Sequence, residues 1–177
     1  VVVKATRVQM YYKGDTIVFD ASAFVIPEGS MLDALVQQMP GATMDEYGNI
    51  SINGKHVDYL MLNGKDFFKG KNKLMLENLP YYTIKDIKVY DKEKDEIEKI
   101  ANANGIQKDY VMDVNLKREY LHSYLGNAEI GGGTKDRWMG RLFGLYTGEL
   151  NTISLYANAN NVNEDRKPGQ DGSWKPS

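Results

Sequence analysis

The sequence predicts an α+β fold, in which a small mixed-sheet domain with two short helices is followed by antiparallel β-strands. Three observations predict it. Residues 30–90 contain two short helical patterns that each end at a proline, with strand patterns between and after them. Asn-Gly pairs at 53–54 and 63–64 indicate tight turns in the same stretch. After residue 120 the chain shows strand-like alternation without a helical period.

The first helix is expected to begin after Ser30, whose hydroxyl is predicted to cap the first turn. Asp33 follows three residues later, where an acidic side chain favours the start of a helix. Pro40 cannot continue the helix, and Gly41 can take the left-handed conformation that follows a helix end. The side chains expected on the buried face are Met31, Leu32, Leu35, Val36 and Met39.

Turn chemistry and alternation predict the next elements. Ile50 and Ile52 alternate with a serine and indicate a strand, which Asn53-Gly54 connects through a type I′ turn to the apolar run 57–62 as a hairpin. That run is nearly continuous, so both of its faces are expected to be covered. Asn63-Gly64 predicts a second tight turn.

A second short helix is expected from Leu74, Leu76 and Leu79, ended by Pro80, and a strand containing Ile87 and Val89 follows it. Residues 91–109 are dense in charge and poor in apolar residues, which indicates a solvated linker. The other strands predicted in this half of the chain are residues 1–12, 16–19 and 110–120. In the last of these, Met112, Val114 and Leu116 face one way, and Asp113 and Asn115 face the other.

Residues 127–133, 138–147 and 152–161 alternate between apolar and polar side chains at even spacing. A transmembrane β-strand of about 9–11 residues shows this pattern, with apolar side chains toward lipid and polar ones toward the lumen. Trp138 and Tyr146 share the apolar face, roughly 27 Å apart along a strand at about 3.4 Å per residue. A tilt of about 40° reduces this to roughly 20 Å of depth, near the apolar band between two aromatic girdles. The opposite face is mixed and fits this pattern less well.

The connections suit strands that cross an outer membrane. The short 148–151 segment is expected on the periplasmic side, and the long polar segment 161–177 is expected outside. Three strands cannot close a barrel, and an open sheet edge is untenable in lipid. We therefore expect the chain to be a fragment. In isolation its last strands should be disordered, pair with another copy, or fold back on the preceding domain.

The order of these pieces resembles the plug domain of TonB-dependent outer-membrane receptors, of the group with an outer-membrane β-barrel family C-terminal part. The matching pieces are Leu32-Asp33-Ala34-Leu35, Pro40-Gly41, residues 48–57, Asn63-Gly64-Lys65, residues 76–80 and residues 84–91, and residues 126–137 and 155–161 resemble opening barrel strands. Asn63 stands where many such plugs carry Asp, and both residues tolerate positive φ. The resemblance implies a plug-like domain over residues 1–118. It implies the first strands and an extracellular loop of an incomplete outer-membrane β-barrel over residues 119–177.

The resemblance implies a receptor for active uptake of a ligand across the outer membrane of a Gram-negative bacterium, with the plug inside the barrel and accessible from the periplasm. The implied partners are an energy-coupling TonB-type protein that engages a segment upstream of Val1, an unknown small-molecule or oligomeric ligand, and the outer membrane itself. Loop position predicts the ligand contacts as Lys65, Asp66, Phe67 and Phe68.

Composition narrows the classes of function. A net charge of −2 gives no electrostatic case for nucleic acid, and the absence of cysteine excludes disulfides and thiolate metal sites. The two histidines, His56 and His122, are expected to be exposed and without a catalytic role, and no phosphate loop or nucleophile motif occurs. We therefore expect no enzyme, no cofactor and no metal site. The alternative is a soluble periplasmic or surface-exposed binding module for a ligand or a protein, whose 12 tyrosines present the binding surface.

Overall fold

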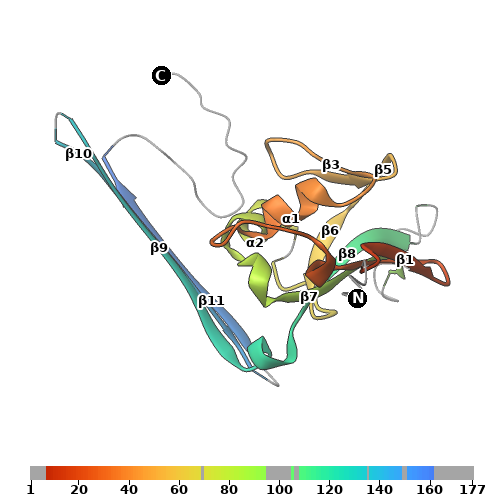
Figure 1. Cartoon of the computed structure of the whole chain (residues 1–177). Helices are drawn as coiled ribbons and strands as arrows, with labels where there is room; N and C mark the ends of the chain where they lie inside the picture. The colour runs from red at the N-terminus through yellow and green to blue at the C-terminus, as the bar shows by residue number, and fades with distance from the viewer. Residues whose placement is uncertain are drawn as a thin grey trace, which may run out of the picture.

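The computed structural model describes residues 7–68, 70–94, 105, 108–134, 136–148 and 151–161. Figure 1 shows an α+β unit and a long, narrow three-stranded sheet that extends away from it. Residues 1–6, most of the predicted linker and the polar segment after residue 161 lie outside the described residues. The α+β class, the mixed sheet and the two short helices are confirmed.

The central sheet of the α+β unit has five strands in the order β1-β2-β7-β8-β6. Their bounds are β1 Met10–Lys13, β2 Thr16–Asp20, β7 Ile84–Glu93, β8 Lys108–Leu116 and β6 Tyr59–Leu62. All neighbours are antiparallel except β6 and β8, which run parallel. Both strands predicted before residue 20 and the turn between them form, but the first is shorter than predicted, since the described residues 7–9 precede β1.

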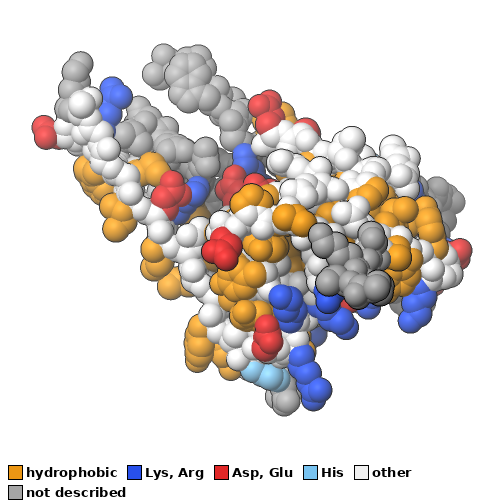
Figure 2. Space-filling model, in the orientation of Figure 1, with side chains coloured by type: hydrophobic (Ala, Val, Ile, Leu, Met, Phe, Trp, Pro, Cys, Tyr) orange, Lys and Arg blue, Asp and Glu red, His pale blue; other side chains and the backbone are white. Residues whose placement is uncertain are grey.

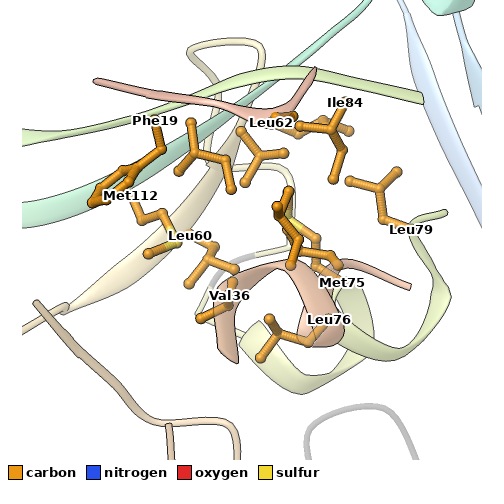
Figure 3. Packing of buried hydrophobic residues seen from close by; sticks show 14 of the residues in the cluster. Phe19, Val36, Leu60, Leu62, Met75, Leu76, Leu79, Ile84 and Met112 are labelled. Atoms are coloured by element: carbon orange, nitrogen blue, oxygen red, sulfur yellow. The ribbon is translucent and has the colours of Figure 1, made fainter. Parts of the chain in front are cut away.

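Both α-helices cover one face of this sheet (Figure 1). They are α1 Leu32–Gln38 and α2 Asn72–Asn78. Each is followed by a buried apolar C-cap residue, Met39 or Leu79, and then by a proline. Figure 3 shows side chains of both helices and of the sheet meeting in one core. The residues labelled there are Phe19, Val36, Leu60, Leu62, Met75, Leu76, Leu79, Ile84 and Met112.

The apolar face predicted for α1 is confirmed, whereas the capping role predicted for Ser30 is wrong. Met31 is the N-cap residue and makes no side-chain capping bond. The amide of Leu32 instead donates to the carbonyl oxygen of Leu79 at 2.8 Å, and the amide of Tyr81 donates to that of Ser30 at 3.2 Å. A backbone acceptor near α2 therefore satisfies the start of α1, and no side-chain cap is required.

A small second sheet corrects the predicted hairpin. Its order is β3-β4-β5, with β3 Ala42–Met44, β4 Ile50–Ile52 and β5 Lys55–His56. Asn53 and Gly54 both have positive φ, 51° and 80°, as a type I′ turn requires, so the turn itself is confirmed. Across this turn β4 pairs with the two-residue strand β5 and not with the run 57–62. The chain then leaves the small sheet and joins the central sheet as β6.

The remaining short elements are three 3₁₀ helices, η1 Ala21–Ala23, η2 Tyr81–Thr83 and η3 Arg118–Tyr120. The second Asn-Gly turn is confirmed, since Asn63 and Gly64 have φ values of 49° and 78°. In β8, the residues predicted to share one face, Met112, Val114 and Leu116, are all buried.

The three segments predicted as strands after residue 120 form one antiparallel sheet in the order β11-β10-β9. Their bounds are β9 Ser123–Gly133, β10 Arg137–Thr147 and β11 Thr152–Asn160. The connection between β10 and β11 includes two residues outside the described ranges. Among the helices that the structure describes, none combines the length and apolar character needed to cross a bilayer.

Replacing Leu35 by Ala should lower the free energy of unfolding by about 2–5 kcal/mol, because the side chain is 1% exposed and its removal leaves a cavity between α1 and the sheet. Urea unfolding of the 177-residue chain measures this change. The matched control is Val25→Ala, whose side chain is 91% exposed and whose replacement should change stability by less than about 0.5 kcal/mol. Equal losses for both variants would contradict the assigned core.

Candidate functional site

The register of β9, β10 and β11 sorts their side chains onto two faces of opposite character. Directly paired residues share a face, and the pairs Leu142 with Ala128 and Leu142 with Ala157 fix the alternation. We define the outer face as Tyr124, Gly126, Ala128, Ile130, Gly132, Trp138, Gly140, Leu142, Gly144, Tyr146, Ile153, Leu155, Ala157 and Ala159. Every side chain on this face is apolar, aromatic or absent.

The large side chains of the outer face are exposed, apart from the half-buried Tyr146. Ile130 is 90% exposed, Tyr124 85%, and Ile153 and Leu155 about 60%. Figure 2 shows hydrophobic side chains along one side of the long sheet, away from the α+β unit. A water-soluble surface rarely leaves a contiguous apolar patch of this kind uncovered, so the outer face indicates a non-aqueous neighbour.

Aromatic rings stand at both ends of the outer face. Tyr124 and Tyr146 are directly paired across β9 and β10, with ring centroids 4.8 Å apart. Trp138 stands at the opposite end of β10 and is 52% exposed. Between these ends the outer face carries only aliphatic side chains and glycine. Amphipathic rings at two levels with an apolar band between them are typical of a membrane-facing strand.

The inner face of the same sheet is divided along its length. Leu125, Phe143 and Leu145 are buried and belong to the same hydrophobic cluster as the core of the α+β unit. Farther along the strands, Glu129 pairs directly with Arg141, and the two side chains form an ion pair. Phe143 and Leu145, two of the apolar residues that made this face a poor match to a lumen pattern, are thus among those that pack on the α+β unit, whereas Met139 is outside the cluster.

The four predicted ligand contacts fall into two groups. Lys65 and Asp66 are exposed, directly after the Asn63-Gly64 turn. Phe68 is buried in the core cluster, Phe67 packs against it, and the two rings meet edge to face at a centroid distance of 4.9 Å. Contact of all four with a ligand stays a prediction, and Lys65 and Asp66 are the two whose side chains reach the surface.

A residue that sequence analysis did not single out for the site holds the base of this loop. Asp113 of β8 is buried, and its Oδ1 accepts a hydrogen bond of 2.8 Å from the amide of Gly64. Burial raises the pKa of the Asp113 carboxyl, while the Gly64 amide and the Asn115 side chain act in the opposite direction. The two residues are 49 positions apart, so no local pattern could have joined them.

Other chemistry-bearing side chains are dispersed. His56 and His122 are both exposed. Within the described ranges, no three His, Asp or Glu residues converge in a way that would hold a metal ion. The exposed tyrosines of the described residues include Tyr11 and Tyr12 on β1, Tyr47 in the β3–β4 connection, Tyr82 in η2 and Tyr124 on β9. They come from several elements and not from one.

No family model matches the chain, and no curated protein matches it. A solved structure of a protein named copper transporter OprC has a similar chain trace, with a TM-score of 0.37 and 12% sequence identity. The alignment covers 85% of this chain and 24% of that chain, so the present sequence spans about a quarter of the transporter's length. At this level of similarity the likeness supports no argument about fold or function.

Replacing Asp113 by Asn should stabilise the chain more at neutral pH than in acid. Because the folded-state pKa is raised, the stability that Asp113 contributes is fully present below its ordinary pKa of about 3.9 and is lost as the pH rises through the raised value. Asn cannot ionise and keeps an acceptor for the Gly64 amide. Urea unfolding of both chains at roughly pH 3 and at about pH 7 measures the difference.

The control is Asp15→Asn in the exposed turn between β1 and β2, which should leave the pH dependence unchanged. A difference between the wild-type and Asp113→Asn chains that stays the same at both pH values would contradict the role assigned to burial.

Proposed function

We propose that this chain is the plug region and the first barrel strands of an outer-membrane receptor of the TonB-dependent type, which takes up a ligand across the outer membrane of a Gram-negative bacterium. The observation behind the proposal is the two-faced sheet β9–β11. Its outer face carries only apolar and aromatic side chains and glycine, and Leu125, Phe143 and Leu145 of its inner face pack on the α+β unit. That is the arrangement expected of a barrel wall with a plug inside it.

Strand length supports a membrane-crossing role. β9 and β10 have 11 residues each and β11 has 9. A transmembrane β-strand needs about 9–11 residues. The outer-face glycines at positions 140 and 144 add no polar group that lipid would have to accommodate. Charged side chains of β10 at positions 137 and 141 both lie on the inner face.

The proposal divides the chain near residue 118, with the plug before it and barrel strands after it. η3 occupies Arg118–Tyr120 and connects β8 to β9. Tyr120 lies against the core cluster and its ring meets that of Tyr82 at 5.8 Å. The junction is therefore packed, which supports a plug held against this part of the wall.

The sheet edges require further strands in the complete receptor. Among the described strands, β9 and β11 pair only with β10, so each has one edge without a partner. In hydrocarbon every backbone N–H and C=O must be satisfied internally. The proposal therefore places additional strands beside both β9 and β11, with a closed barrel as the result.

The energy source and the ligand belong to the same proposal. A TonB-type protein would engage a segment that precedes Val1, and the plug would rearrange to let the ligand pass. Lys65 and Asp66 are the proposed ligand contacts, because they are exposed on the loop between β6 and α2. The proposed role is transport, not catalysis.

Cysteine accessibility in the complete gene product tests the proposal. The 177 residues contain no cysteine, and the background for each single substitution is the complete gene product with any other cysteine replaced by serine. Ala157 and Asn158 are adjacent on β11, both exposed, and on opposite faces. In outer-membrane vesicles a water-soluble maleimide should label Asn158→Cys and leave Ala157→Cys unlabelled, and both should react after denaturation. Equal labelling of the two variants, or recovery of the protein in the soluble fraction, would refute the proposal.

A charge on the outer face should also destabilise the inserted protein. Ala157 pairs with Leu142, midway between Trp138 and Tyr146. Ala157→Arg should therefore cost about 2–4 kcal/mol of folding free energy in a bilayer, the value for Arg at the bilayer midplane of a barrel. Asn158→Arg, at the same depth on the inner face, should cost much less. Unfolding of the complete protein from lipid vesicles by guanidinium measures both values, and equal costs would argue against lipid contact.

A further inference from the structure

We infer that Asn63 and Asp113 form a clamp that positions the loop bearing Lys65 and Asp66, and that the clamp requires a neutral side chain at position 63. The inference rests on the proposed function for the loop's contact with ligand. The clamp itself is read from hydrogen bonds within the α+β unit.

Three hydrogen bonds tie the turn to β8. The amide of Asn63 donates to the carbonyl oxygen of Val114 at 2.9 Å, which extends the parallel pairing of β6 and β8 by one residue. The amide of Leu116 donates to Oδ1 of Asn63 at 2.9 Å, and the amide of Gly64 donates to Oδ1 of Asp113 at 2.8 Å. Side chains from both segments therefore accept backbone bonds from the other segment.

The chemistry at position 63 follows from its neighbour. The turn conformation alone accepts either Asn or Asp, because both tolerate positive φ. An Asp at position 63 would still accept from the Leu116 amide, but it would place a second carboxylate one residue from the amide that binds Asp113. Asp113 is only 6% exposed, so water screens the repulsion weakly. Two carboxylates held by the same turn disfavour each other's ionised form, so the second charge destabilises the turn.

The surrounding charges do not remove this conflict. The groups of β7 that act on Asp113 are Asp86, Lys88 and Tyr90. Asp86 already accepts a 3.1 Å hydrogen bond from Asn115 and lies 4.0 Å from the Lys88 ammonium. Lys88, the β7 cation that acts on Asp113, is thus shared with another carboxylate, and the Gly64 amide is the direct hydrogen-bond donor to Asp113.

The clamp determines where the loop begins. Leu62 and Lys65 exchange two backbone hydrogen bonds, of 2.9 and 3.1 Å, across the turn. The position of Lys65 is therefore fixed by the turn, and the turn is fixed by β8. Asn63 and Asp113 act as positioning residues in this arrangement, because neither is a proposed ligand contact.

A double-mutant cycle tests the clamp in the full 177-residue chain. The variants are Asn63→Asp, Asp113→Asn and the double variant, and the readout is amide hydrogen exchange at Gly64 and Leu116 near pH 7. Asn63→Asp should speed exchange of both amides by about tenfold, within the range of coupling energies for contacting residues. The double variant has a single carboxylate again and should return exchange close to the wild-type rate. Exchange at the buried amides of α1 reports any change in global stability, and the rates at Gly64 and Leu116 are compared with it in all four chains.

Asn53→Asp is the matched control, because the Asn53-Gly54 turn has the same dipeptide and the same positive φ values and its asparagine is exposed. It should leave exchange at Gly64 and Leu116 unchanged. The inference is overturned if Asn63→Asp exchanges like the wild type, if the double variant is not restored, or if the double variant fails to fold. The labelling test on β11 concerns other residues, so its failure would refute the transport proposal and leave the clamp standing.

Discussion

The hydrophobic cluster that continues from the α+β unit onto the long sheet is the constraint on which the other features depend. Leu125, Phe143 and Leu145 are part of the same cluster as the side chains between the helices and the central sheet. Once these residues face the core, the two-residue period of a β-strand directs their neighbours outward. The exposed apolar face is therefore a direct result of the packing on the other side, and a one-residue change of register would exchange the two.

Much of the fold could be predicted because its causes are local. Both Asn-Gly turns have the positive φ values that Asn and Gly tolerate. Both helices end two residues before a proline, Pro40 or Pro80, which cannot continue a helix. Ser30 shows where local reasoning fails. Its sequence context suggests a cap, yet a carbonyl 47 residues beyond Leu32 satisfies the helix instead, as the bond from Leu32 to Leu79 shows. The predicted pairing of β4 with the run 57–62 was wrong for the same reason, because that run forms β6 and pairs with the distant strand β8.

The same distinction between local and distant causes applies to the candidate site. Alternation was sufficient to predict the outer face within residues 127–133, 138–147 and 152–161, whereas Tyr124 and Gly126 lie on a part of β9 that was not predicted as strand. Phe143 and Leu145 on the other face already departed from a lumen pattern in the sequence, and their packing in the core cluster gives the reason. The bond between Gly64 and Asp113 joins the turn after β6 to the distant strand β8 and had no signal in the sequence. The ligand contacts were predicted from loop position alone, which could not distinguish the exposed Lys65 from the buried Phe68.

The loop between β6 and α2 is held at both ends, by the turn at Asn63-Gly64 and by Phe68 in the core. Lys65 and Asp66 lie between these two attachments and reach the surface. Natural variation can therefore change the charge, size or polarity of these two side chains while the backbone that presents them keeps its place. Under the proposed function, substitutions at these two positions alone would change which ligand a related receptor takes up and would leave the stability of the plug unchanged.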